Sequence, residues 1–176
     1  MATRDLSDYD PTAVPDAKKL RFGIIVSDWN QDVTFSLLKG ATETLTRHGV
    51  SENDILVTHV PGSFELTHGA MMVAENEKVD AVICLGCVIQ GETPHFTYIC
   101  EGVAYGLSRL NIEYDIPFIF GVLTTNTMQQ AIDRSGGIHG NKGDEAAVTA
   151  IKMAAMSKKY RKQVYLSTLR TKATVK

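Results

Sequence analysis

The sequence lacks a long apolar run and a strong net charge, and each absence excludes a class of protein. No segment is long and apolar enough to cross a membrane, and the polar N-terminus MATRDLSDYDPTAVPDAKK has no signal-peptide stretch. We therefore expect a cytoplasmic protein with no membrane partner. The formal net charge of -2 provides no overall field that would attract nucleic acid.

Cysteines are also few, and their spacing argues against a redox or zinc site. Cys84 and Cys87 form a C-x-x-C inside an apolar run, whereas a redox pair opens a helix and a zinc site needs further ligands. We predict buried structural thiols. Four histidines show no pairing at metal-ligand spacing: His48, His59, His68 and His139. We therefore predict no metal.

The charge is unevenly distributed along the 176 residues. Residues 157–176 hold seven basic residues and no acidic one, which leaves 11 basic and 20 acidic residues elsewhere. We interpret 157–176 as a basic C-terminal helix end or tail, either solvated or reserved for an anionic surface. Residues 1–19 are a flexible or partner-docked N-terminal segment, and residues 20–156 form a single domain.

Two kinds of sequence pattern, strand-like and helical, alternate along that domain. Continuous β-rich apolar runs at 20–27, 54–60, 79–89 and 116–123 are typical of strands that are covered on both faces. Helical patterns occupy 31–48, 63–76, 94–111, 126–134 and 142 to about 160, and Gly49 suits a helix stop. This order predicts a three-layer α/β/α fold, a four-stranded parallel sheet with helices on both faces.

Open sheets of this kind bind ligands beyond the carboxyl ends of their strands, where the strand order reverses. The residues after each run are therefore candidates: SDWN (27–30), PGSFE (61–65), QGETPHF (90–96) and the segment from Phe120.

The stretch GETPHF places a histidine at a helix start. Thr93 is a good N-cap and Pro94 suits the first helical position, so His95 falls in the first turn. Free N–H groups there favour an anion such as phosphate, and they disfavour an imidazolium. His95 is either a proton-transfer base or a surface histidine.

Two further stretches bring aromatic rings to the same edge. In PGSFEL, Ser63 is a candidate helix cap, Phe64 either a core or a ligand-binding ring, and Glu65 either a helix-dipole partner or a ligand acceptor. Trp29 is the only tryptophan and either packs or stacks on a heterocycle. Asp28 and Asn30 beside it are candidate helix caps.

The last glycine-rich stretch is RSGGIHGNKG (134–143). It matches neither a Walker loop nor a dinucleotide fingerprint, and its plain interpretation is a connection between two helices. Arg134 and Lys142 are candidate phosphate partners there.

Taken together, VPGSFEL, GCVIQGETPHF, FGVLTTNT and an arginine six residues before GNKG resemble the lumazine synthase family of riboflavin biosynthesis, from about Arg21 to Met156. The resemblance implies a flavodoxin-like sheet and an enzyme, a transferase that needs no cofactor or metal. It implies the condensation of 5-amino-6-(D-ribitylamino)uracil with 3,4-dihydroxy-2-butanone 4-phosphate to the lumazine, phosphate and water.

The resemblance also implies roles for matching positions. Trp29 stacks on the pyrimidine. Ser63, Phe64 and Glu65 hold its ribityl side, and the backbone of Cys87, Val88 and Ile89 reads its edge. Glu92 and Thr93 form the phosphate-binding turn, and His95 transfers protons. Phe120 is an aromatic lid completed from a neighbouring subunit, and Arg134 and Lys142 hold phosphate.

The family implies pentamers with sites at subunit interfaces, in some members decamers or shells of 60 subunits, and association with riboflavin synthase. Asp28, Gln90 and Ile138 depart from the commoner pattern, because basic residues are frequent at those three positions. Two other readings stay open: a non-catalytic riboflavin or lumazine carrier on the same fold, and a flavodoxin-like electron carrier that binds FMN.

Overall fold

The computed structural model describes residues 9–174, with side chains to residue 161, and is built on one parallel sheet. Its strands are β1 (Phe22–Ser27), β2 (Ile55–Val60), β3 (Ala81–Ile89) and β4 (Phe118–Thr125), in the order β2-β1-β3-β4. All neighbouring pairs are parallel. The predicted four-stranded sheet is confirmed, and the strand order reverses between β1 and β3.

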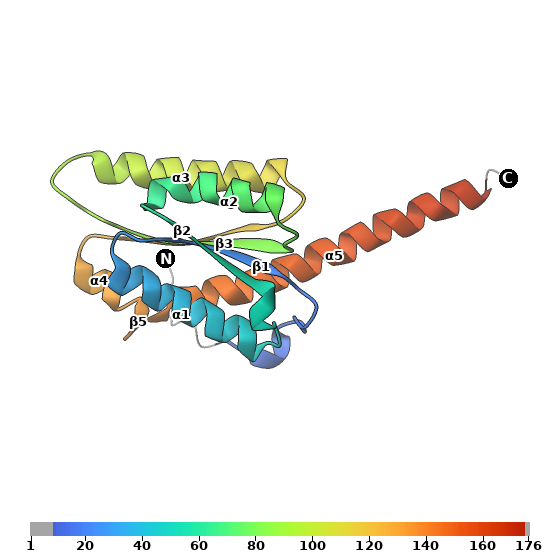
Figure 1. Cartoon of the computed structure of the whole chain (residues 1–176), viewed down its shortest axis with the longest axis horizontal. Coiled ribbons are helices and arrows are strands. Elements are labelled where there is room, and N and C mark those ends of the chain that lie inside the picture. Colours follow the sequence, from blue (N-terminus) through green and yellow to red (C-terminus); the bar gives the residue numbers. More distant parts are fainter. Residues whose placement is uncertain (1–8, 175–176) are drawn as a thin grey trace.

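Helices cover both faces of this sheet (Figure 1). Helices α1 (Gln31–Arg47), α4 (Met128–Ile132) and α5 (Lys142–Thr174) lie on one face, and α2 (Leu66–Asn76) and α3 (His95–Glu113) lie on the other. Successive strand residues point to opposite faces, so Ile24 and Val26 join the core under α1 and α5, while Ile25 joins the core under α2 and α3. The three-layer α/β/α prediction is therefore confirmed.

Several boundaries differ from the sequence patterns. The second helix is preceded by a 3-10 turn, Ser63–Glu65, and α4 is only five residues long. Two further 3-10 turns of the same length lie at Pro11–Ala13 and Glu52–Asp54. The stretch from Arg134 to Lys142 contains a small antiparallel hairpin, β5 (Ser135–Gly137) with β6 (Gly140–Asn141), which the sequence pattern did not reveal.

Gly49 ends α1 as predicted. It has a positive φ of 93°, a backbone conformation that glycine adopts without a steric penalty, and its N–H donates to the Thr46 carbonyl at 2.9 Å. Ala17 and Leu20 are buried in the core cluster that also holds Leu45 near the end of α1. Tyr9 lies on His48, with its hydroxyl 2.9 Å from Nε2. Residues 1–8 of the predicted N-terminal segment lie outside the described part.

Helix α5 is longer than the sequence pattern predicted. It continues past residue 160 to Thr174 and leaves the rest of the domain (Figure 1). Lys158 Nζ lies 3.0 Å from Asp80 Oδ1, and Arg161 donates to the Asp115 carbonyl, so two basic side chains fix the helix before it projects. Whether 157–176 serves an anionic surface stays a prediction. In the range 9–174, no helix is long and apolar enough to cross a membrane.

Candidate functional site

The end of β3 lies beside an open space at the switch point. The last β1–β3 pair is Val26 with Leu85, whereas β3 continues beside β4 as far as Ile89 with Thr125. The final four residues of β3 therefore have a strand on one side only. The residues that follow β1 and β2 occupy the other side, as the topology of an open sheet predicts.

Trp29 stands on this open side. The backbone N–H groups of Asp28 and Trp29 donate to the carbonyls of Val60 and Pro61 at 2.8 and 3.0 Å, which ties the loop after β1 to the end of β2. A Cβ added to Gly62 would lie 2.6 Å from Trp29 Cε3, so only glycine lets the ring lie this close. The indole is still 67% exposed and presents its surface to solvent.

Ser63, Phe64 and Glu65 form the 3-10 turn after β2. Ser63 is buried and does not cap a helix as expected, because its hydroxyl donates to the Cys87 carbonyl at 3.4 Å. Glu65 Oε2 accepts from the Gly62 N–H at 3.1 Å. Phe64 is 57% exposed and lies against Gly102 of α3, so it is not a core residue. The turn thus presents an exposed ring next to the end of β3.

The end of β3 contributes backbone rather than a reactive thiol. Cys87 is buried, and burial raises the pKa of its thiol to about 11. Burial likewise raises the pKa of the Cys84 thiol. The prediction of buried structural cysteines is confirmed for both. Val88 and Ile89 are half-buried at the edge.

The GETPHF turn leads into α3 one residue later than predicted. The helix begins at His95 and Pro94 occupies the cap position with no side-chain hydrogen bond, so the prediction that Thr93 caps the helix is wrong. Glu92, Thr93 and His95 are exposed. The first N–H groups of α3 have no partner within the helix and are available to an anion.

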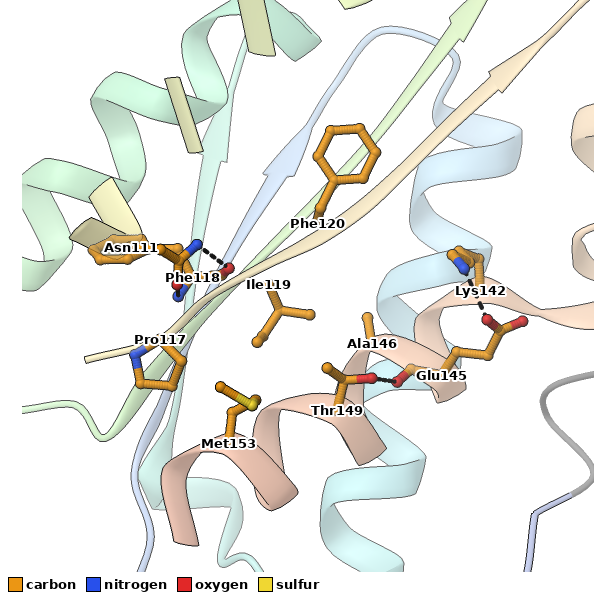
Figure 2. Close-up of a pocket in the computed structure, with 10 residues that line it drawn as sticks. All are labelled: Asn111, Pro117, Phe118, Ile119, Phe120, Lys142, Glu145, Ala146, Thr149 and Met153. Carbon is orange, nitrogen blue, oxygen red and sulfur yellow. Dashed lines mark hydrogen bonds and ion pairs between the residues drawn. The ribbon is translucent and has the colours of Figure 1, made fainter. Parts of the chain in front are cut away.

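Phe120 and Lys142 form a separate group. Phe120 lies inside the run 116–123 that was predicted as a strand, in β4 and paired with Cys84, and not beyond the strand end with the other candidates. It lines a cavity of about 360 Å³ together with Lys142 and Glu145 of α5, which form an ion pair at 2.8 Å (Figure 2). The cavity opens beside β4, which is an edge strand of the sheet.

Arg134 belongs to this second group through the hairpin. The Lys142 N–H donates to the Arg134 carbonyl at 2.9 Å, which holds the two residues side by side. The guanidinium donates to the Gln130 carbonyl at 3.0 Å. Asn141 donates to the Ser36 carbonyl at 3.0 Å and anchors the hairpin on α1. Arg134 is half-buried, so part of its side chain reaches the surface of the protein.

Phe120 does not lie beside the end of β3 within one chain. It is five positions before Thr125, the partner of Ile89, and five residues of strand span roughly 17 Å. The structure brings together a first group, which consists of Trp29, Ser63, Phe64, Glu65 and the end of β3. The second group consists of Phe120 and Lys142 at the cavity beside β4, and of Arg134 next to Lys142 in the hairpin.

Asn30 lies beside Trp29 in the first group, and the sequence pattern did not predict what its side chain does. It was a candidate cap for α1, but its side chain makes no cap bond and instead donates to the Cys87 carbonyl at 3.1 Å. Asp28 does not cap either, and its carboxylate lies 2.8 Å from His59 Nδ1. Within the described residues, no group of three or more histidine, cysteine or acidic side chains gathers as a metal site would.

Comparison with known proteins decides the family. The family model described as 6,7-dimethyl-8-ribityllumazine synthase matches residues 19–158. This chain belongs to that family. The match includes both groups of site residues and ends before most of the projecting part of α5.

Individual lumazine synthases are similar over nearly their whole length. The protein of that name from Parabacteroides distasonis is 59% identical over 156 residues, 89% of this chain and 98% of its own. The one from Phocaeicola vulgatus is 56% identical over 161 residues, 92% of this chain and 96% of its own. The Porphyromonas gingivalis protein is 57% identical over 157 residues, 89% of this chain and 98% of its own.

Proposed function

We propose that the chain catalyses the penultimate step of riboflavin biosynthesis. In this reaction 5-amino-6-(D-ribitylamino)uracil condenses with 3,4-dihydroxy-2-butanone 4-phosphate to 6,7-dimethyl-8-ribityllumazine, phosphate and water. The observation that carries the proposal is the family match, which spans both groups of site residues. An amine of the pyrimidine attacks the ketone, an imine forms with loss of one water, phosphate leaves, and ring closure releases a second water.

The first group suits the pyrimidine. A planar heterocycle stacks on an exposed aromatic face, and Trp29 offers such a face beside the end of β3. The end of β3, Cys87, Val88 and Ile89, lines its edge and supplies backbone hydrogen bonds from the side that faces away from β4, and Glu65 accepts from the ribityl hydroxyls next to Ser63 and Phe64. These roles rest on the position of each residue in the motif and on the shared edge of the sheet.

The start of α3 and the second group suit the ketose phosphate. The N–H groups of the Glu92–Thr93 turn and of the first residues of α3 attract a phosphate, and Arg134 can bind two of its oxygens with a planar guanidinium. Lys142, whose backbone N–H bonds Arg134 and whose ammonium group pairs with Glu145, is the second cation of this group. His95, exposed at the same helix start, transfers protons during imine formation. No cofactor or metal enters these steps.

The two groups complete one site only if they come from two chains. We place the first group of one subunit against Phe120, Arg134 and Lys142 of its neighbour, in a pentamer that decamers or a 60-subunit shell would extend. Two surface features support self-association. The edge of β4 carries the open cavity beside Phe120, and α3 exposes Tyr98, Tyr105 and Ile112 at intervals of seven residues. Such a stripe suits packing between helices.

Purified protein mixed with both substrates tests the reaction directly. We expect lumazine fluorescence to rise well above the uncatalysed rate, and light scattering to give a mass near five subunits or a multiple of five. Tight riboflavin binding without turnover would instead identify a carrier. Action in the cytoplasm and association with riboflavin synthase stay predictions, and co-elution with that enzyme tests the second.

A further inference from the structure

Asn30 has a backbone conformation that is unusual for its type. It is the only non-glycine residue with a positive φ in the range 9–174, at φ 59° and ψ 44°. L-residues avoid this left-handed region, and asparagine tolerates it better than most. The residue lies between Trp29 and the first turn of α1. A conformation that costs free energy at this place calls for a compensating contact.

The compensating contact is with the end of β3. Asn30 Nδ2 donates to the Cys87 carbonyl at 3.1 Å, and the buried Ser63 hydroxyl donates to the same oxygen at 3.4 Å. The two donors come from the loops after β1 and β2, which are far apart in the sequence. The Cys87 carbonyl lies beyond the last β1–β3 pair, so no strand residue of β1 is left to satisfy it. Side chains thus replace the missing strand.

This replacement fixes the direction of the next backbone groups. In a strand, the N–H and C=O of residues i and i+2 point to the same side. The Gln90 N–H donates to Thr125 at 2.8 Å, so residues 88 and 90 face β4, while Cys87 and Ile89 face the open side. Ile89 therefore presents its N–H and C=O on the side where Trp29 stands.

We propose that Asn30 is a positioning residue for the planar ring of the pyrimidine substrate. It ties the Trp29 loop to β3, and thereby holds the indole face and the Ile89 backbone edge at a fixed separation. Stacking and edge hydrogen bonds are then both available to one heterocycle. The proposal rests on the placement of the pyrimidine at the first group.

Only asparagine combines the two properties that this position needs. Glycine adopts the left-handed backbone but has no donor, whereas aspartate tolerates the backbone but offers only acceptors to the Cys87 carbonyl. Alanine has neither property. The three substitutions therefore separate the effect of the backbone from that of the side-chain amide.

The test is a titration that needs no turnover. Trp29 is the only tryptophan of the chain, so quenching of its fluorescence by 5-amino-6-(D-ribitylamino)uracil reports binding at this place. We expect Asn30→Gly and Asn30→Asp to bind the pyrimidine about three- to tenfold more weakly, the usual loss for one hydrogen bond, and Asn30→Ala to bind it more weakly still because the backbone is strained as well. The KM for the ketose phosphate should stay within twofold of the wild-type value.

Asn76→Ala is the matched control. Asn76 also donates its side-chain amide to a backbone carbonyl, that of Met72 at 2.8 Å, but on the exposed end of α2. We expect wild-type pyrimidine binding for this variant. Far-ultraviolet circular dichroism and the melting temperature identify any Asn30 variant that misfolds, and Asn30→Gly, which keeps the favoured backbone, is then the deciding variant.

A double substitution checks that the two donors share one acceptor. Ser63→Ala leaves the Cys87 carbonyl with the Asn30 donor, and Asn30→Gly leaves it with Ser63. With both removed the carbonyl has neither, so the combined loss of affinity should exceed the product of the two single losses. A combined loss that equals this product would contradict a shared clamp.

Two outcomes distinguish this proposal from the function on which it rests. If the pyrimidine quenches wild-type Trp29 but Asn30→Gly binds it equally well, Asn30 has no positioning role and the site assignment stands. If the pyrimidine does not quench Trp29 in the wild-type protein, the assignment of the first group is wrong and the proposal fails with it.

Discussion

The two groups of site residues differ in how they are held. The first group is interlocked within its own chain, since hydrogen bonds from the two loops after β1 and β2 join the Trp29 loop, Gly62 and Ser63 to each other and to Cys87 of β3. The second group lies along an edge strand, where Phe120 is 40% exposed and Arg134 bonds to its own helix turn and hairpin. One group is organised for a ligand before binding, and the other presents side chains outward. The difference favours a division of labour between neighbouring subunits.

The largest expected effect is on the activity of assemblies that contain two different variants. Such mixtures test whether the two groups of one site come from different chains. One variant lacks the rings of the first group (Trp29→Ala with Phe64→Ala), and the other lacks Arg134 (Arg134→Ala). Each alone should retain little activity. After dissociation and reassembly in equal amounts, about a quarter of the sites should receive intact groups from two chains, if assortment is random. Each variant reassembled by itself is the control, and no recovery in the mixture would place both groups in one chain.

Arg134→Ala sharpens the role of the second group. Hydrogen bonds to a charged group stabilise more than neutral ones, so we expect the KM for the ketose phosphate to rise about 10- to 100-fold. Pyrimidine binding, followed by Trp29 fluorescence, should not change. Arg134→Lys should lie in between, because lysine keeps the charge without the planar pair of donors.

Arg47→Ala serves as the control for that series, because Arg47 is exposed in the last turn of α1, at the end of that helix away from Trp29. A rise in both KM values on Arg134→Ala would show that Arg134 supports the fold of the site rather than phosphate.

His95 tests whether the helix start contributes chemistry or only binding. We expect His95→Ala to lower kcat about tenfold, less than a proton-transfer group often contributes, because much of the rate comes from holding two substrates together. The pH dependence of kcat should become flatter between about pH 5 and pH 9. His68→Ala, an exposed histidine on α2, should leave kcat unchanged. Full activity of His95→Ala across that range would contradict proton transfer.

The smallest expected effect is that of Cys87→Ala, on how the free energy of unfolding depends on pH. Burial raises the pKa of its thiol from 9.0 to about 11, so the folded state holds the proton more tightly than the unfolded state. The resulting stability is complete below pH 9 and is lost as the pH rises through 11. Urea unfolding at pH 8.5 and pH 11 should show a loss about 2 kcal/mol smaller in Cys87→Ala than in the wild type. Equal losses would mean that water reaches the thiol.

The sequence was sufficient for the sheet and most helices, because continuous apolar runs and helical periodicity are local signals. The sequence was insufficient to predict very short strands, or contacts between residues that are distant along the chain. The hairpin at Ser135–Asn141 has strands of three and two residues, too short for any periodic pattern. The strand predicted at 116–123 is Phe118–Thr125 in the structure, because nothing in the run FIFGVLTT marks where the strand ends.

The site was predictable to the level of edge and motif. Trp29, Phe64 and Glu65 were identified by their position after a strand, and the structure gathers them with the end of β3. The Asn30–Cys87 hydrogen bond spans 57 residues, and only the tertiary fold reveals it. Ser63 and Thr93 were both good candidates for helix caps. Instead, the Ser63 hydroxyl donates to the Cys87 carbonyl, and Pro94 rather than Thr93 occupies the cap position of α3.

Helix α5 has a practical consequence for what can be attached to this protein. About 13 residues follow Arg161 within the helix, which at 1.5 Å per residue amounts to roughly 20 Å. A fluorescent label or a second protein joined beyond the helix would begin at that distance from Arg161, where α5 has left the rest of the domain (Figure 1). The helix is thus a built-in spacer that holds an attached cargo away from the sheet.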